Sequence, residues 1–375
     1  MPSGSGKGDI LIARAAVDSF ADRYSAFESV APRPGRQTAG DRTGTISSSY
    51  KLAEAMPGLP FAERYPTADI FAPTFVFKRP AERAHAGAPA APYKLASLSP
   101  EVPYGRPVVK QAHTDLIGFD NSAFPYFGRN PRTGERFSQG GRYSDNRVLV
   151  HVPAGFDVRK PGVIVLFFHG HGATLQRDVR DRQLLPLQIS ESGMNAVLVA
   201  PQLAYDAADS SAGKFWEPGG LKRFMAEAAD RLARIYGDPR ASEAFARMPV
   251  VIVAYSGGFV SAASCLQVGG LGSRIRGVVL LDALYGEMDK FTSWIVNNRS
   301  AFFVSAYTQY TRHRDDELAR ILRDKGVAVS HDLNGPLQPG TVAFLATEGV
   351  RHRDYVTLAW TEHPVKDILQ RMPRR

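Results

Sequence analysis

The chain has 375 residues, and because one domain usually holds about 100 to 200 residues, this length predicts two domains or one large domain with an appendage. Hydrophobic residues make up 44% of the sequence and charged residues 22%, which excludes the disordered and collagen-like classes of protein. The longest apolar runs, such as Val163–Phe168, are far shorter than the ~20 residues that a membrane-spanning helix needs.

The net charge of +9 is spread along the chain. Residues 1–150 hold 19 basic and 14 acidic side chains, and the remainder holds 27 and 23, so both parts carry a similar excess. A protein that binds nucleic acid concentrates its basic residues in one patch, so the sequence predicts no nucleic-acid partner.

The cysteine content limits the possible cross-links and metal sites. The single cysteine, Cys265, excludes an internal disulfide and a cysteine-rich zinc site. The lack of disulfides favours a cytoplasmic location. Residues 1–20 do not contain the apolar core of a signal peptide. A location in the cell envelope stays open if a signal peptide was removed from the sequence. The sequence shows no cofactor motif, so we predict no cofactor.

The first part of the chain differs in composition from the rest. Residues 1–105 hold 12 of the 26 prolines, with clusters of small residues and little periodicity. This composition predicts an irregular or wrapping extension over residues 1–105, followed by one folded domain over residues 106–375.

From about Tyr143 onward, short apolar runs rich in β-branched residues alternate with stretches of helical periodicity. This pattern predicts an α/β fold, with a mostly parallel central sheet that is covered by helices on both faces. The predicted strands are 147–152, 163–168, 196–200, 250–254, 277–281, 301–306 and 342–346. The predicted helices are 174–190, 221–236, 257–266, 290–297, 315–325 and 364–372.

The most informative segment is residues 250–259 (VVIVAYSGGF), in which an apolar strand runs into Ser256 and a helical pattern follows. A nucleophilic serine on a sharp strand-to-helix turn needs small residues two positions before and two after it, because the backbone folds back on itself there. Ala254 and Gly258 meet this need, although Ala254 stands where glycine is more common. The alternative is a glycine-rich turn that joins a strand to a helix without any chemistry.

A second glycine-containing loop, HGHG at residues 169–172, follows the strand predicted at 163–168. His169 and His171 could bind a metal through their H-x-H spacing, but alanine and threonine stand where the next ligands would be expected, so we predict no metal. One of these histidines could instead be a hydrogen-bonded structural residue.

With these two segments, the chain from about residue 140 to its end, about 60% of its length, resembles the α/β-hydrolase superfamily. The resemblance implies a catalytic serine, acid and histidine in that chain order. It also implies an oxyanion hole formed by the N–H groups of His171 and Gly257.

The order implied by the resemblance is met by Ser256, Asp282 and His352. We prefer Asp282 as the acid, because a carboxylate at the end of an apolar strand is costly to bury without a partner such as an imidazolium. Members of the superfamily more often carry the acid one strand later, so Asp315 and Asp316 remain alternatives. Asp282 could also serve only to cap a helix.

Of the nine histidines, His352 has the position expected of the general base, in a loop just beyond the last predicted strand. His363, which begins the final predicted helix, is the alternative if that loop is longer than predicted.

The loop of residues 206–220 follows the third predicted strand and is long, polar and aromatic. Loops at the carboxyl ends of parallel strands line the ligand crevice, so Asp209, Phe215 and Trp216 are candidate substrate contacts, with Tyr255 beside the serine as another. The alternative is that the aromatic side chains pack in the core.

These features predict a metal-independent serine hydrolase that cleaves a carboxylic ester, or an amide, in a small-molecule or polymer-derived substrate. A catalytically silent binding or scaffold protein on the same fold is the alternative, favoured by Ala254 and the open choice of acid. A phosphate site at the two glycines after Ser256 would need a lysine or further glycines nearby, and the sequence supplies neither.

Overall fold

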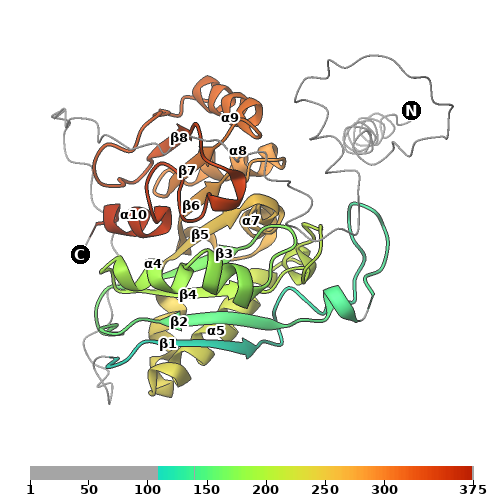
Figure 1. Ribbon diagram of the computed structural model, residues 1–375, viewed down its shortest axis with the longest axis vertical. Coiled ribbons are helices and arrows are strands. Elements are labelled where there is room, and N and C mark those ends of the chain that lie inside the picture. Colours follow the sequence, from blue (N-terminus) through green and yellow to red (C-terminus); the bar gives the residue numbers. More distant parts are fainter. Residues whose placement is uncertain (1–108, 139, 374–375) are drawn as a thin grey trace, which may run out of the picture. The chain divides into compact units, whose positions relative to one another are not determined.

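The computed structural model describes residues 109–138 and 140–373 (Figure 1). The extension predicted over residues 1–105 lies outside the described residues. The chain divides into two units, and of the first only residues 129–135 are described. In that segment the N–H of Gly134 donates to the carbonyl of Asn130 at 2.8 Å and closes a tight loop. The second unit contains the sheet and the helices.

The second unit is built on an eight-stranded sheet with the order β1-β2-β4-β3-β5-β6-β7-β8. β2 pairs antiparallel with both β1 and β4, and every neighbouring pair from β4 to β8 is parallel. Parallel strands end at the same edge, so the loops after β3, β5 and β6 meet there. The strands are β1 (His113–Gly118), β2 (Arg147–Val152), β3 (Val163–Phe168), β4 (Ala196–Pro201), β5 (Val250–Tyr255), β6 (Ile275–Leu281), β7 (Phe302–Tyr307) and β8 (Val342–Ala346).

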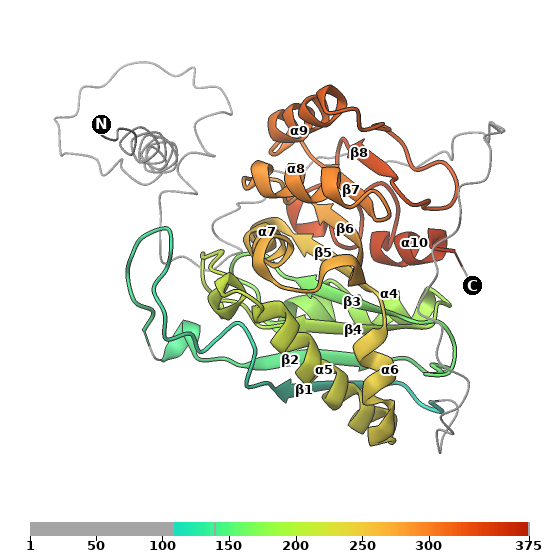
Figure 2. The same cartoon turned by 180° about the vertical axis from the view of Figure 1, so that it is seen from behind.

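Helices cover both faces of the sheet (Figures 1 and 2). One face packs against a π-helix (Leu175–Arg182), α4 (Leu185–Glu191) and α10 (Pro364–Arg371). The opposite face packs against the remaining helices: α5 (Gly220–Tyr236), α6 (Ser242–Arg247), α7 (Phe259–Val268), α8 (Met288–Asn297) and α9 (Arg312–Asp324). The predicted fold class is thereby confirmed.

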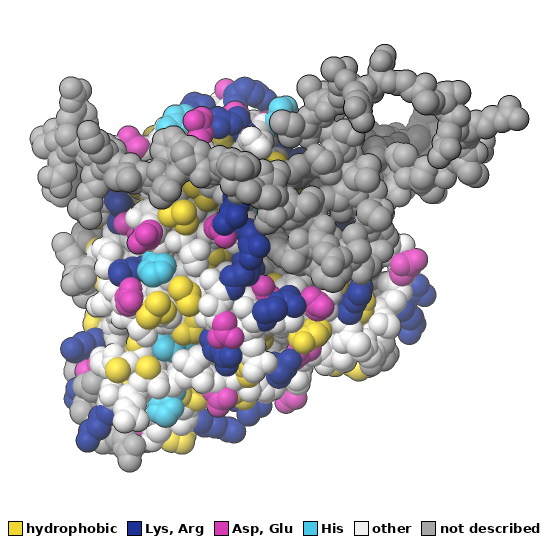
Figure 3. All heavy atoms as spheres, viewed as in Figure 1, with side chains coloured by type: hydrophobic (Ala, Val, Ile, Leu, Met, Phe, Trp, Pro, Cys, Tyr) yellow, Lys and Arg dark blue, Asp and Glu magenta, His cyan; other side chains and the backbone are white. Residues whose placement is uncertain are grey.

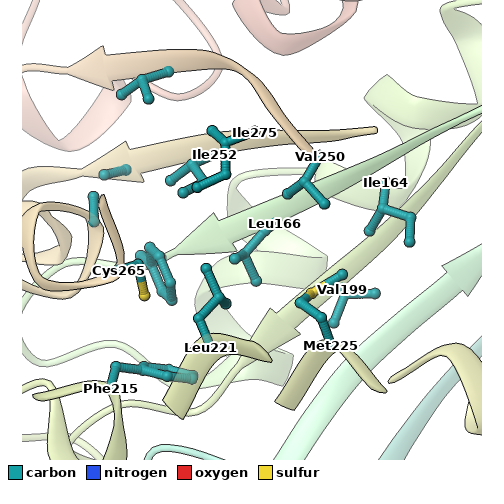
Figure 4. Close-up of a cluster of buried hydrophobic side chains, with 14 of the residues drawn as sticks. Ile164, Leu166, Val199, Phe215, Leu221, Met225, Val250, Ile252, Cys265 and Ile275 are labelled. Atoms are coloured by element: carbon teal, nitrogen blue, oxygen red, sulfur yellow. The ribbon is translucent and has the colours of Figure 1, made fainter. Parts of the chain in front are cut away.

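Each face of the sheet has its own hydrophobic core. Along β3, Ile164, Leu166 and Phe168 belong to the cluster beneath α5–α9, while Val163, Val165 and Phe167 belong to the cluster beneath α4 and α10. This alternation follows from the two-residue period of a strand, and it explains why β3 is apolar at every position. Figure 4 shows part of the first cluster, in which the core side chains of β3 and β5 face Leu221, Met225 and Cys265.

Two elements were missing from the sequence prediction, and one predicted helix is divided. β1 was missed because only two of its six residues, Leu116 and Ile117, are apolar, and α6 because it has only six residues. The helix predicted at 174–190 is a π-helix followed by α4, separated by Leu184 in the left-handed region (φ 55°). Pro186 at the start of α4 explains the division, because its ring cannot fit within a continuous helix.

Charged side chains of both signs are interspersed over the face that carries α4 and α10 (Figure 3). This arrangement agrees with the even spread of charge along the sequence. Within residues 109–138 and 140–373, no helix combines the length and hydrophobicity required to cross a membrane.

His151 of β2 makes the stability of this fold depend on pH. Its ring is buried between Thr114 and Ser190, whose hydroxyls lie 2.8 Å from Nδ1 and Nε2, and burial lowers its pKa to about 4. The unfolded chain takes up this proton near the ordinary pKa of about 6.5, so the free energy of unfolding should fall as pH drops from 6.5 to 4, by about 3 kcal/mol. Urea denaturation across this range measures the slope. His151→Gln should make the slope shallower, and an unchanged slope would contradict the assignment.

Candidate active site

Ser256 occupies a strained turn between β5 and α7. Its φ is +51°, a left-handed conformation that costs a non-glycine residue roughly 1–3 kcal/mol and persists only where the surroundings impose it. A side chain at Gly258 would place its Cβ 2.4 Å from the carbonyl oxygen of Phe168, so only glycine fits there. The buried Ala254 pairs with Phe168 of β3 and Leu280 of β6, so alanine is accommodated at the position where glycine is more common.

The structure brings Ser256, His352 and Asp282 together from three different loops. Ser256 Oγ lies 2.9 Å from His352 Nε2, and Asp282 Oδ2 lies 2.6 Å from His352 Nδ1. A carboxylate can only accept, so Nδ1 carries the proton and Nε2 is left to accept the hydrogen bond from the Ser256 hydroxyl. This geometry allows the imidazole to take a proton from the serine.

Asp282 is completely buried directly after β6, with φ +47°. Its Oδ1 accepts hydrogen bonds from the N–H and the hydroxyl of Thr308, both at 3.0 Å, and from the hydroxyl of Thr311 at 3.3 Å. These donors from the loop after β7 hold the carboxylate against the imidazole and offset the cost of its burial. Sequence reasoning missed both threonines, because they come close to Asp282 only in the folded sheet.

The alternative acids, Asp315 and Asp316, have hydrogen-bond partners other than His352. Asp315 on α9 is buried and accepts a hydrogen bond from the hydroxyl of Ser305, and burial raises its pKa to about 8. Asp316 is exposed and accepts a hydrogen bond from the hydroxyl of Tyr307 at 3.2 Å. The carboxylate that bonds to His352 is that of Asp282.

The alternative base, His363, caps the start of α10. Its Nδ1 lies 3.8 Å from Glu191 Oε2 on α4, and its backbone N–H donates to the carbonyl of Thr357. The histidine that hydrogen-bonds to Ser256 is His352.

Tyr255 contacts His352. Its hydroxyl donates to the backbone carbonyl of His352 at 2.9 Å, and its ring stacks on the imidazole with centroids 5.0 Å apart. Tyr285 meets the imidazole edge-on at 6.3 Å. Tyr255 is only 1% exposed, and its two contacts hold His352 in place. Substrate contact by Tyr255 remains a prediction.

The loop of residues 169–172 passes directly over the serine. A Cβ added to Gly170 would lie 2.7 Å from Ser256 Cβ, and one added to Gly257 would lie 2.4 Å from Cδ2 of the His171 ring. The two predicted oxyanion donors, His171 and Gly257, therefore belong to backbone segments that meet beside Ser256. The His171 ring in turn hydrogen-bonds through Nε2 to the hydroxyl of Ser210.

The predicted substrate contacts in the loop after β4 have different environments. Phe215 is fully buried against Phe168 and Phe224, and Figure 4 places it among core side chains, as in the alternative interpretation of this loop. Substrate contact by Phe215 remains a prediction. Its ring fills the core between α5 and the sheet.

Trp216 and Asp209 also make internal contacts. Trp216 is half-buried, with its ring 6.1 Å from that of Phe137. Asp209 accepts hydrogen bonds from Ser211 through Oδ1 and from the hydroxyl of Tyr143 through Oδ2. Substrate contact by either residue remains a prediction.

Within the described part of the chain, no group of three or more His, Cys, Asp and Glu side chains is arranged to hold a metal ion. His169 and His171 have different hydrogen-bond partners: His171 Nε2 bonds to Ser210, whereas His169 Nε2 lies 2.8 Å from Gln202 Nε2. Gln202 was not singled out in the sequence; the available signal was a polar residue immediately after a buried strand at the carboxyl edge of the sheet.

No protein-family model and no curated protein matches the sequence. Among solved structures, the chain is similar to a ferulic acid esterase at 11% identity and a TM-score of 0.42, over 70% of this chain and 98% of that one. It is also similar to an IroE-like serine hydrolase from Shewanella oneidensis at 12% identity and a TM-score of 0.40, over 70% and 79% of the two chains.

A third similar structure is that of an uncharacterized protein from Bacillus cereus, at 12% identity and a TM-score of 0.36 over 56% of this chain. The chain spans only 59% of the length of that protein.

The sheet order and the positions of the site residues decide the fold. Six parallel strands follow an antiparallel pair at one edge, Ser256 stands on the strained turn after β5, and His352 follows β8. The described chain therefore has the α/β-hydrolase fold, as the resemblance in its sequence implies.

Proposed function

We propose that the protein is a serine hydrolase that cleaves a carboxylic ester through an acyl-enzyme on Ser256. The observation that carries the proposal is the continuous hydrogen-bonded arrangement of Ser256, His352 and Asp282, held on a strained turn at the carboxyl edge of the sheet. Unusual backbone strain at a hydrogen-bonded serine is typical of a nucleophile.

In the first half of the reaction, Ser256 Oγ attacks the carbonyl carbon of the ester while its proton passes to His352 Nε2. The new imidazolium is stabilised by Asp282, whose carboxylate already lies 2.6 Å from Nδ1. As the tetrahedral intermediate collapses, the bond to the alcohol oxygen breaks, and His352 returns the proton to the leaving alcohol. The acyl group stays on Ser256 as an ester.

In the second half, a water molecule attacks the acyl carbon and gives its proton to His352, and the bond to Ser256 Oγ breaks as that oxygen takes the proton back. The N–H groups of His171 and Gly257 bind the oxyanion in both halves. A single donor of this kind is worth about 3–4 kcal/mol in comparable enzymes.

The acyl chemistry also permits an amide as substrate, because the triad acts on the carbonyl whatever the leaving group. A matched pair of substrates that share one acyl group, p-nitrophenyl acetate and p-nitroacetanilide, separates the two activities. We expect turnover of the ester. Preference for the anilide would reassign the protein as an amidase with the same nucleophile.

A fluorophosphonate probe tests the nucleophile, because it phosphonylates activated serines. We expect stoichiometric labelling of the wild-type chain at Ser256 and no labelling of Ser256→Ala. Ser261→Ala, at the third residue of α7, is the matched control and should label like the wild type. If the wild-type chain is not labelled, the proposal fails and a catalytically silent binding protein on the same fold becomes the better interpretation.

A further inference from the structure

Gln202 is a completely buried side chain immediately after β4, and its amide is bonded at both ends. Its Oε1 accepts a hydrogen bond from the N–H of Leu175 at 3.1 Å. Its Nε2 donates to the carbonyl of Ala173 at 3.1 Å and lies 2.8 Å from His169 Nε2. The carbonyl and N–H partners fix the orientation of the amide, so the group that faces the histidine is an N–H donor.

This donor determines which nitrogen of His169 carries the proton. His169 Nε2 receives a second donor, the backbone N–H of Leu203, at 2.9 Å. Burial lowers the pKa of His169, so the ring is neutral and has one N–H. With two donors pointing at Nε2, the proton must be on Nδ1, which lies 2.8 Å from the carbonyl oxygen of Gly170 and donates to it.

The carbonyl of Gly170 belongs to the same peptide unit as the N–H of His171. In a trans peptide the C=O and N–H bonds point in opposite directions within one plane. A hydrogen bond that holds the Gly170 oxygen on one side of the loop therefore fixes the direction of the His171 N–H on the other side. The loop passes over Ser256, against which Gly170 packs.

We propose that Gln202 is a positioning residue: it fixes the tautomer of His169, which holds the Gly170 carbonyl and so aims the His171 N–H at the oxyanion. The inference rests on the proposed function, in which that N–H binds the developing charge. Gln202 itself is completely buried, and its hydrogen bonds are with His169, Ala173 and Leu175 and not with Ser256.

The far end of the loop is held by other contacts. The N–H of Gly172 donates to the carbonyl of Ala207 at 2.7 Å, and Arg177 donates to the carbonyl of Gly172. Loss of the Gln202 amide should therefore leave the loop in place while it frees the one peptide plane that carries the donor.

Gln202→Met tests the proposal, since methionine has a similar size and cannot donate. Oxyanion donors act mainly in the transition state, so we expect kcat for p-nitrophenyl acetate to fall about 10- to 100-fold while KM changes less than about threefold. For each variant, kcat is calculated from the concentration of sites that a fluorophosphonate labels, so unfolded molecules are not counted as enzyme.

Asn195→Leu is the matched control at the opposite end of β4. Both ends of the Asn195 side-chain amide are also hydrogen-bonded. Its Oδ1 accepts from the backbone N–H of Asp157 at 2.9 Å, and its Nδ2 donates to the backbone carbonyl of Asp157 at 2.9 Å. This variant should lose stability and keep the wild-type kcat per labelled site. Equal values of kcat in Gln202→Met and Asn195→Leu would overturn the proposal.

Two substitutions of His169 test the tautomer directly. In asparagine the amide nitrogen is attached to Cγ, as Nδ1 is in histidine, so His169→Asn can still donate to the Gly170 carbonyl. In His169→Gln the amide is one bond further out and mimics Nε2. We expect His169→Asn to retain at least about tenfold more kcat than His169→Gln, and equal losses would contradict the tautomer argument.

Failure of this inference can be told from failure of the proposed function. If the wild-type chain is neither labelled nor active, the function is wrong. If it is labelled and active but Gln202→Met keeps its kcat, Ser256 remains the nucleophile and only the role of Gln202 is refuted.

Discussion

His352→Ala is expected to lower kcat for ester hydrolysis by about 10⁴- to 10⁶-fold, because it removes the group that accepts the Ser256 proton. Removing the serine or the histidine of a triad costs nearly as much as removing all three members, since the remaining members cannot complete the proton transfer. The residual rate reflects substrate binding and the oxyanion donors. Single-turnover measurements with excess enzyme detect such a low rate and separate acylation from product release.

His363→Ala is the control for this variant, because His363 is the other histidine considered for the base. Its ring lies near Glu191 and has no hydrogen bond with Ser256 in the described structure, so we expect kcat within about threefold of the wild type and a small change in stability. If His363→Ala abolished activity while His352→Ala did not, the assignment of the base would be wrong.

Asp282→Asn is expected to lower kcat by about 10⁴-fold while the fold is retained. The asparagine amide can present an N–H to His352 Nδ1 and so favour the tautomer whose proton is on Nε2, which cannot accept the proton of Ser256. Thr308 and Thr311 surround this side chain with donors and will favour an amide orientation in which the oxygen faces them and the nitrogen faces the imidazole. Steady-state kinetics, with circular dichroism to check the fold, measure the effect.

Asp315→Asn and Asp316→Asn are the controls for the acid. Because burial raises the pKa of Asp315 to about 8, its carboxyl is mostly protonated at pH 7, and a neutral amide of the same shape replaces it with little disturbance. Asp316 is exposed. We expect both variants to keep kcat within about fivefold of the wild type at pH 7. A large loss in Asp315→Asn together with a small loss in Asp282→Asn would move the acid to α9.

Seven of the eight strands in the described part of the chain could be predicted from the sequence, because burial on both faces leaves a mostly apolar run that needs no tertiary information to recognise. β2, β3 and β8 have the predicted boundaries, and the other four predicted strands differ by one or two residues at one or both ends. β1 is an edge strand paired on one side only, and its polar residues His113, Thr114 and Asp115 carry no such signal.

Ser256, Asp282 and His352, which the sequence analysis grouped together, are hydrogen-bonded in the structure, and their catalytic roles remain a proposal. Ser256 could be recognised from a local motif, because the small residues that its sharp turn requires stand close to it in the sequence. The choice between Asp282 and Asp315 stayed open because both follow apolar strands, and only the folded structure shows which carboxylate reaches His352. Gln202 acts through partners that are distant in the chain, so no local pattern marks it.

The aromatic residues of the loop after β4 show the same limit. Phe215 and Trp216 are neighbours in the sequence, and the position of the loop at the carboxyl edge suggested a similar role for both. In the structure a 3₁₀ turn over Gly213–Trp216 directs Phe215 into the core and leaves Trp216 half-buried. The direction of each side chain depends on that turn, which the composition of the loop does not reveal.

The placement of Cys265 has a practical consequence for labelling experiments. The only thiol of the chain belongs to α7 and is buried in the core, and burial raises its pKa, so little thiolate is present and reagents cannot reach it. The natural protein can therefore be treated as free of reactive cysteine. A cysteine placed at an exposed position, for example Leu187→Cys on α4, would be the single site for a maleimide dye or a spin label, with no need to alter the core first.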